Sequence, residues 1–374
     1  MTDAVGREEI VLNMGPHHPS THGVLRFVVY TDGEIMRKAV PEVGYLHRGI
    51  EKLAEQTTYT SFIPYADRIN YLEAVFASQV WAMAVERLLG VEVPKRAEVL
   101  RVIAAELNRI ANHCIALGCV AMDLGAYTPF IYLLRERETI NDLFEELCGA
   151  RLTFNYARVG GVSHDAPDGW LDKVGAFVAR FDKVMAELHA LISENEILVN
   201  RMLGVGVTCA ADAVAYGLVG PNLRAAGVDW DLRRDLPYSA YPGLDFAVPV
   251  GGRDGRGVAG DCYARWVVRE EEMRQSARLI RQALAALPDG PVMGELPKKI
   301  KPPKGEVYAA VEGARGELGV YLVSDGSNTP YRAKWRSSSF SAMSMIELIS
   351  PGLMIADLVA VIATLDTIAP EVDR

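Results

Sequence analysis

The loop from Gly15 to Gly23 is the most unusual local feature of the sequence, because it holds three histidines in the order GPHHPSTHG. Its two prolines and its terminal glycines exclude a regular helix or strand. We expect a rigid loop in which His22 points into a cavity, since Gly23 beside it lets the backbone turn freely. An imidazole in such a place could exchange a proton near neutral pH. A tight surface turn without a function would have the same composition.

Asp123 is the second candidate, because it interrupts an apolar stretch that runs from Cys114 to Leu134. A buried carboxylate is costly unless it is paired or hydrogen-bonded, and a buried histidine would be a suitable partner. The alternative is an ordinary carboxylate at the end of a helix, bound to backbone N–H groups.

Arg68 and Tyr71 form the third candidate. They lie in residues 66–89, whose apolar spacing predicts a helix, and on that helix they would share one face. The alternative is an exposed polar face on which Arg68 pairs with Asp67 beside it. The charged run RERE at 135–138 predicts a solvated or mutually paired helix face.

The spacing of the residues gives little support for a metal site or a nucleotide-binding site. The five cysteines include no C-x-x-C pair, which excludes the usual thiolate motifs for zinc and Fe–S clusters, and they fit no disulfide framework. His17 and His18 are adjacent, and because neighbouring side chains diverge in a loop we expect no metal site there. The sequence GVGVTC at 204–209 lacks the last glycine of a dinucleotide-binding loop.

An α+β fold is expected to position these residues, with a central helical bundle between an N-terminal and a C-terminal β-rich segment. Strands are predicted within 9–40, with a turn at Asp32-Gly33. Apolar periodicity predicts helices at 66–89, 97–117, 128–148, 170–200, 267–286 and 354–365. A linker rich in proline and lysine spans 288–305, and strands follow at 306–311, 317–324 and 331–335. We therefore divide the chain at 1–60, 61–290 and 291–374, as parts of one structural unit.

The composition narrows the class of protein further. Of the 374 residues, 50% are hydrophobic and 23% are charged, which allows a large core. The net charge of −9 argues against a general nucleic-acid binder. The apolar stretch that ends at Leu134 is broken by Asp123, Gly125 and Pro129, so we expect no membrane span, and the first nine residues lack a secretory signal.

Several motifs, taken together with the histidine loop, are similar to one family. They are GYLHRGIEK at 44–52, RERET at 135–139, LRAAGV at 223–228, ARGELG at 314–319, VSDG at 323–326 and EVDR at 371–374. Nearly the whole chain resembles the 49 kDa, or D-type, subunit of proton-pumping NADH:quinone oxidoreductase, respiratory complex I. That family in turn resembles the large subunit of nickel–iron hydrogenases, which implies the same fold here. The C-x-x-C pairs that hold the hydrogenase metals are missing from this sequence, so we expect no hydrogenase activity.

The resemblance implies a role for each candidate residue. His22 and Tyr71 match the residues that hydrogen-bond the quinone carbonyls, and Asp123 matches the partner of that histidine. Arg68 matches an arginine beside the terminal Fe–S cluster of the neighbouring small subunit. The chain would pass electrons from that cluster to quinone, coupled to proton translocation, and would itself bind no metal or other cofactor.

The resemblance also implies partners and a location. The partners would be the B-type Fe–S small subunit, the C-type subunit and the H-type membrane subunit, at the cytoplasmic face of the bacterial inner membrane, with membrane contact through partners. The chain has Thr153 where complex I relatives often carry a histidine, which brings menaquinone into consideration beside ubiquinone. The segment at 287–305 is shorter than in many relatives. Two alternatives stay open: the same module in a ferredoxin- or deazaflavin-dependent quinone or phenazine oxidoreductase, and a structural scaffold with an inactive cavity.

Overall fold

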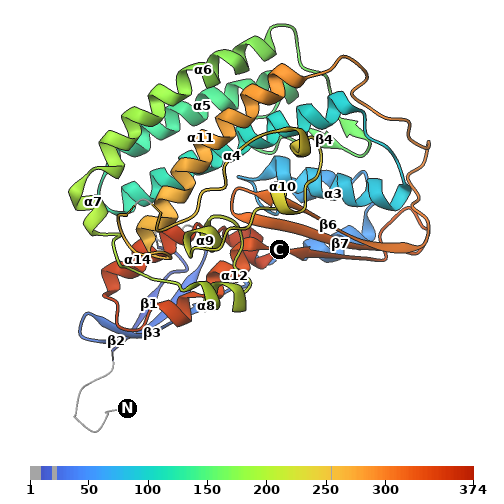
Figure 1. The fold of residues 1–374 in the computed structure, drawn as a ribbon. Coiled ribbons are helices and arrows are strands. Elements are labelled where there is room, and N and C mark those ends of the chain that lie inside the picture. Colours follow the sequence, from blue (N-terminus) through green and yellow to red (C-terminus); the bar gives the residue numbers. More distant parts are fainter. Residues whose placement is uncertain (1–9, 19–22, 254) are drawn as a thin grey trace.

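The computed structural model describes residues 10–18, 23–253 and 255–374. Its largest part is a layer of long helices that lie roughly side by side in Figure 1: α4 (Lys95–Asp123), α5 (Tyr127–Cys148), α6 (Trp170–Leu188) and α11 (Cys262–Ala286). Helix α4 is the centre of this layer, packed against both α5 and α11. It is buried over nearly its whole length because it carries apolar or paired side chains on every face. In contrast, α6 buries a single stripe of apolar residues, as expected for an outer helix.

Two antiparallel three-stranded sheets complete the α+β architecture that the sequence predicts. The N-terminal sheet has the order β1 (Ile10–Met14), β2 (Arg26–Asp32) and β3 (Ile35–Glu42). The C-terminal sheet has the order β6 (Gly305–Gly313), β7 (Gly316–Ser324) and β8 (Arg332–Arg336). Helix α3 (Ala74–Leu89) packs on β6 and β7. A short ribbon pairs β4 (Ala157–Arg158) with β5 (Gly161–Val162).

Short helices connect these parts. They are α1 (Ile50–Gln56), α2 (Ile63–Asp67), α7 (Glu196–Asn200), α8 (Ala210–Ala215), α9 (Gly220–Ala225), α10 (Leu232–Asp235), α12 (Ser338–Ser344), α13 (Ile346–Ile349), α14 (Ile355–Leu365) and α15 (Ala369–Asp373). Within the described residues, no helix is both long enough and apolar enough to cross a membrane.

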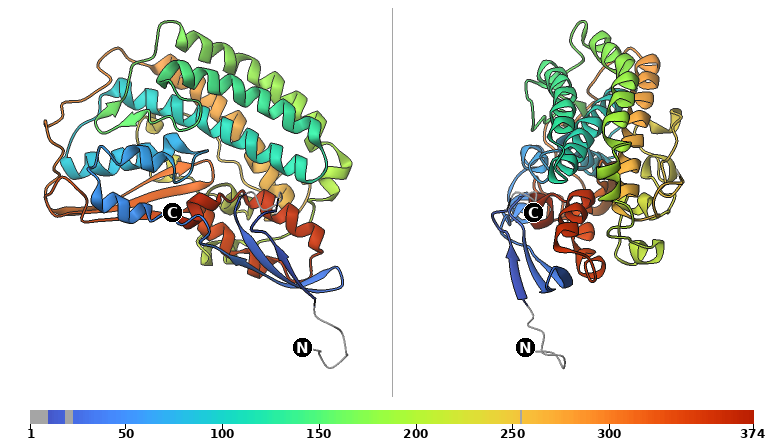
Figure 2. Two further views of the ribbon diagram at one scale, coloured as in Figure 1. Left: turned by 180° about the vertical axis from the view of Figure 1, so that it is seen from behind. Right: turned by 90° about the vertical axis from the view of Figure 1, so that its left-hand side faces the viewer.

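The N-terminal sheet lies against the C-terminal helices, and both views in Figure 2 show these two ends of the chain side by side. Backbone bonds join them: the N–H of Met36 donates to the carbonyl of Leu353 at 2.8 Å, and the N–H of Ile355 donates to the carbonyl of Glu34 at 3.0 Å. The carboxylate of Asp373 accepts the N–H groups of Gly44 and Leu46, at 2.8 and 2.7 Å. The division at 1–60, 61–290 and 291–374 stays a prediction.

Two of the predicted helices are interrupted in the structure, and two others, predicted at 97–117 and 267–286, are longer than predicted: α4 spans Lys95–Asp123 and α11 begins at Cys262. The helix predicted at 66–89 is two helices, α2 and α3, separated by a turn at residues 68–73. In this turn the Asn70 side chain accepts the N–H of Leu72 and so competes with the helical hydrogen bonds. The helix predicted at 170–200 ends at Leu188 and is followed by a π-helical turn at His189–Ser193, after which Asn195 caps a new helix, α7. Arg68 and Tyr71 therefore do not share one helix face.

Candidate functional site

Tyr71 lies in the turn at residues 68–73, and its side chain is partly exposed, at 36%. Both residues beside it are fixed by hydrogen bonds. Asn70 is buried, and its side-chain oxygen accepts the N–H of Leu72 at 3.2 Å. The carbonyl of Leu72 accepts the side-chain amide of Asn108, on α4, at 2.9 Å. The turn therefore presents the phenol at the surface of the chain from a backbone that the interior holds in place.

Arg68 follows α2 directly and is exposed. Its Nη1 donates to the carbonyl of Pro64 at 2.6 Å, and its own carbonyl accepts the guanidinium of Arg48 at 2.9 Å. Asp67 is fully buried instead of pairing at the surface, and its carboxylate accepts the N–H of Asn155 at 2.6 Å. The alternative of an exposed Arg68–Asp67 pair is therefore wrong. Burial raises the pKa of Asp67 to about 7.

The contact between Asp67 and Asn155 also places Thr153. This residue is half-buried and lies in the segment that connects α5 to β4. Because Asn155 follows two residues later and bonds to Asp67, the segment runs alongside the end of α2. Thr153 therefore lies in the same part of the molecule as Arg68.

Asp123 is the last residue of α4 and is half-buried. The residue with which we expect it to pair, His22, lies outside the described residues, so the pair stays a prediction. The described end of the loop is Gly23. A side chain at this position would bring its Cβ to 3.1 Å from the Cβ of Ala369, and the φ of 139° disfavours one in any case. The end of the histidine loop thus packs against the start of α15.

Helix α15 is the structural link between the candidate segments. Ala369 lies beneath Gly23, and the carbonyl of Pro370 accepts the guanidinium of Arg48, which also binds the carbonyl of Arg68. Glu371 accepts the side-chain amide of Asn70 at 2.8 Å. The sequence analysis missed this role, although EVDR at 371–374 was one of the motifs that suggested the family. The charges of residues 371–374 do not predict a particular contact. The match of these residues to the family motif was therefore the signal that could have indicated the role of α15.

An apolar cavity of about 540 Å³ lies beside the other described end of the loop. His18 lines it together with Leu12, Met14, Val29, Met354 and Val359. Tyr71 and Asp123 are not among its lining residues. The cavity can accommodate an apolar group next to the histidine loop.

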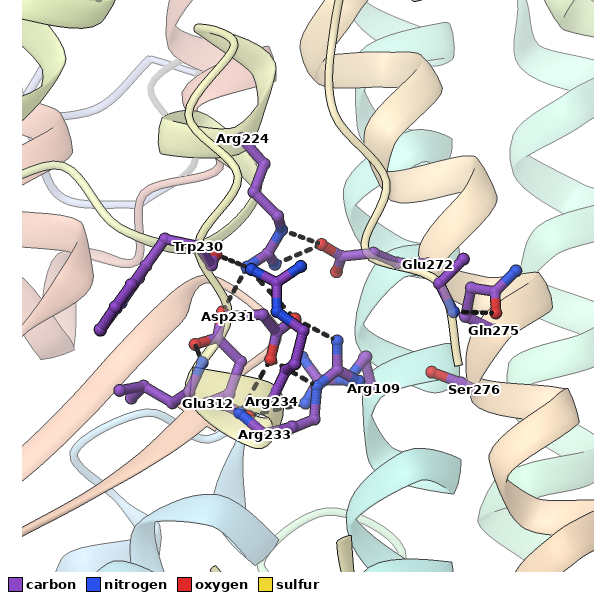
Figure 3. A network of polar contacts seen from close by, with 12 residues as sticks. Arg109, Arg224, Trp230, Asp231, Arg233, Arg234, Glu272, Gln275, Ser276 and Glu312 are labelled. Atoms are coloured by element: carbon purple, nitrogen blue, oxygen red, sulfur yellow. Dashed lines mark hydrogen bonds and ion pairs between the residues drawn. The ribbon is translucent and has the colours of Figure 1, made fainter. Parts of the chain in front are cut away.

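A buried cluster of charged residues holds the helical layer to the C-terminal sheet (Figure 3). Arg224 binds Glu272, on α11, and lies 2.8 Å from Glu312, on β6. Arg109 and Arg233 bind Glu106, on α4. Burial alone would raise the pKa of Glu106, but these two arginines lower it to about 2. The cluster is a structural element that spacing along the sequence could not reveal, because its members come from five separate elements, α4, α9, α10, α11 and β6.

The charged run RERE is mutually paired, as predicted, but its face is not solvated throughout. Glu136 is buried and is bound by Arg135 at 3.0 Å and by Arg180, on α6, at 2.6 Å. Across residues 10–18, 23–253 and 255–374, no group of three or more histidine, cysteine or acidic side chains is placed to hold a metal ion.

Comparison with known proteins identifies the family. A model of the family "Respiratory-chain NADH dehydrogenase, 49 Kd subunit" matches residues 123–303 and 295–374. The chain is 58% identical to the second D-type subunit of NADH-quinone oxidoreductase of Sorangium cellulosum (strain So ce56), over 98% of this chain and 95% of the relative. It is 56% identical to the second such subunit of Anaeromyxobacter dehalogenans (strain 2CP-C), over 98% and 97%. It is 49% identical to the D-type subunit of NADH-quinone oxidoreductase of Bacillus cereus (strain ATCC 14579), over 98% and 99%. The chain therefore belongs to the family of 49 kDa, or D-type, subunits of complex I, and is part of an oxidoreductase complex.

Proposed function

We propose that this chain forms the quinone site of complex I and passes electrons to quinone from an Fe–S cluster in the neighbouring B-type small subunit. The observation that carries the proposal is the convergence of two segments on α15. Gly23, at the end of the histidine loop, packs against Ala369. Asn70, in the Tyr71 turn, donates a hydrogen bond to Glu371. The loop and the turn are separate segments of the chain, and their contacts with the same helix favour a site that uses both.

The chemistry follows from the residue types. Two-electron reduction of a quinone creates anionic oxygens that must be protonated. The Tyr71 phenol would donate a hydrogen bond to one carbonyl, and the His22 imidazole would donate to the other. Asp123 would favour the imidazolium form of His22, because a nearby negative charge raises the pKa of a histidine. The proton that His22 gives to the quinone would then have to be replaced, and this step would couple reduction to proton translocation.

Arg68 would lie beside the Fe–S cluster of the small subunit. Its guanidinium is exposed, so it is available to a partner. A positive charge near a cluster stabilises the reduced form and raises its reduction potential. The C-type subunit and the H-type membrane subunit would complete the site at the cytoplasmic face of the bacterial inner membrane. Because Thr153, near α2, stands in place of a histidine, the chain could use a low-potential acceptor such as menaquinone as well as ubiquinone.

A structure of the assembled complex with a short-chain quinone analogue tests the proposal. We expect one head-group carbonyl within hydrogen-bond distance of the Tyr71 phenol, and the other near His22. A head group bound away from both side chains would contradict it. Measuring whether the same preparation oxidises NADH, reduced ferredoxin or reduced deazaflavin would identify the electron donor, and oxidation of NADH is the expected result.

A further inference from the structure

Behind Tyr71, the side-chain amide of Asn70 bridges two buried carboxyl groups. Its Nδ2 lies 2.9 Å from Oε2 of Glu73 and 2.8 Å from Oε2 of Glu371. All three side chains are fully buried. An amide nitrogen carries two hydrogens, and this one gives one to each carboxyl group. The same side chain accepts the N–H of Leu72 through its oxygen, so the position of Asn70 fixes the backbone on both sides of Tyr71.

The two carboxyl groups accept very different sets of hydrogen bonds from the protein. Glu371 accepts hydrogen bonds from three consecutive serines as well as from Asn70: from the hydroxyls of Ser337, Ser338 and Ser339, and from the N–H of Ser339. So many donors stabilise an ionised carboxylate. Glu73 accepts the N–H of Arg315 at 2.6 Å, but the Arg315 guanidinium lies 3.7 Å away. That guanidinium makes its closer ion pair with Asp366, at 2.7 Å.

The local balance of charge leaves one negative charge in surplus. Three carboxyl groups, of Glu73, Asp366 and Glu371, face two guanidinium groups, of Arg315 and of Arg269, which lies 3.8 Å from Asp366. From α4, Arg109 binds the carbonyl of Gly313, against which Glu73 packs, but the charge of Arg109 is paired with Glu106.

A surplus charge in the interior is costly and is relieved most easily by a proton. Asp366 has a close guanidinium and Glu371 has several hydrogen-bond donors, whereas Glu73 has neither, so the proton belongs on Glu73. Burial accordingly raises the pKa of Glu73 to about 8; Glu371 and Asp366 add to the rise, while Arg315 opposes it.

We propose that Glu73 is a positioning residue for quinone reduction, which holds the Tyr71 turn in place while it is protonated and loosens it when it ionises. The ionised form would repel Glu371 across the amide that both share, and Asn70 would have to move. Because Tyr71 follows Asn70 directly, the phenol would move as well. This inference rests on the proposed contact between Tyr71 and quinone.

The test uses the assembled complex and follows NADH-driven quinone reduction from pH 6 to pH 10 in the wild type, Glu73→Gln and Glu73→Ala. Glutamine has the shape of the protonated acid and cannot ionise. Glu73→Gln should match the wild type at pH 7 and exceed it in the alkaline range, by about tenfold one pH unit above the pKa of Glu73. Glu73→Ala leaves Asn70 with one carboxyl partner and should raise the KM for quinone at every pH. Glu187→Gln, an exposed site on α6, is the matched control and should follow the wild type throughout.

The other possible results would overturn either the positioning role of Glu73 or the contact between Tyr71 and quinone. Identical pH profiles for the wild type and Glu73→Gln would overturn the inference, and so would a Glu73→Gln complex that fails to assemble, since a neutral amide should replace a protonated acid. An unchanged KM in Glu73→Ala would also overturn it. Tyr71→Phe, measured in parallel, separates these failures from a failure of the proposed function. If Tyr71→Phe is slow while Glu73 has no effect, the quinone contact stands and only the positioning role fails.

Discussion

The buried carboxylate of Asp67 accepts the backbone N–H of Asn155, 88 residues away in the sequence, at 2.6 Å. One hydrogen bond thereby connects the end of α2 to the segment that holds Thr153. The group is buried, and burial raises its pKa to about 7.

Replacing Asp67 with asparagine should change how stability depends on pH. Between about pH 4, where an unfolded aspartate ionises, and pH 7, the folded chain holds a proton that the unfolded chain releases. The wild type therefore loses stability as pH rises through this window, and Asp67→Asn does not. The free energy of unfolding of the variant, relative to the wild type, should rise by at most about 1.4 kcal/mol per pH unit. Urea titrations of the purified chain at several pH values measure this, and parallel curves would contradict it. Asp182→Asn, at an exposed site, serves as the control.

Tyr71→Phe should leave the complex assembled and slow quinone reduction roughly 10- to 100-fold, because a hydrogen bond to a charged oxygen contributes about 1.5–3 kcal/mol. Folding should be little affected, since the phenyl ring stays and Asn70 and Asn108 hold the turn. Steady-state turnover with the native quinone is the measurement. Tyr331→Phe, at an exposed site in the C-terminal region, should be silent. Full turnover in an assembled Tyr71→Phe complex would remove Tyr71 from the site.

His22 and Asp123 should act as one unit. Asp123→Asn should lower the pKa of the histidine and slow quinone reduction, and His22→Ala should slow it by a similar factor. The double variant should be no slower than the slower single variant, because residues that act together are non-additive. Rates for all four forms of the complex measure the coupling. Losses that multiply in the double variant would mean that the two residues work independently.

Arg224 and Arg234 provide a matched pair for the energetics of the fold. Arg224 is fully buried between Glu272 and Glu312, and Arg224→Met should cost about 3–5 kcal/mol, because it leaves buried carboxylates without their cation. Arg234 is exposed beside Asp229, and Arg234→Met should cost less than about 1 kcal/mol. Chemical denaturation of the purified chain compares the two. Equal losses would mean that the buried cluster does not hold the helical layer to the sheet.

Local patterns predict the elements of this fold where local interactions dominate. The Asp32-Gly33 turn, the strands beside it and the apolar helix α14 all appear where the sequence places them. The helix predicted at 66–89 fails because Asn70 bonds to the backbone beside it and opens a turn, an outcome that apolar spacing does not report. The arginine cluster could not be predicted for another reason. Arg224 and Glu312 are 88 residues apart in the sequence, so only the packed fold brings them together.

The candidate site shows the same limit. Its individual residues could be named from the resemblance, but the buried groups behind them, Asn70, Glu73 and Glu371, could not. Their importance comes from two hydrogen bonds on one amide nitrogen, one of which spans 301 residues. Residue types and their spacing along the sequence do not indicate such a contact.

The dependence of the N-terminal region on α15 has a consequence for biosynthesis. Gly44 donates to the carboxylate of Asp373, a bond that spans 329 residues. A ribosome synthesises the chain from its N-terminus, so the first sheet and the Tyr71 turn lack their supporting helix until residues 369–373 have been translated. Until the C-terminal helices exist, the face of the N-terminal sheet that packs against α13 is uncovered, and the nascent chain is a natural client for chaperones. The Tyr71 turn and the N-terminal sheet thus gain their full support only after α15 has been translated.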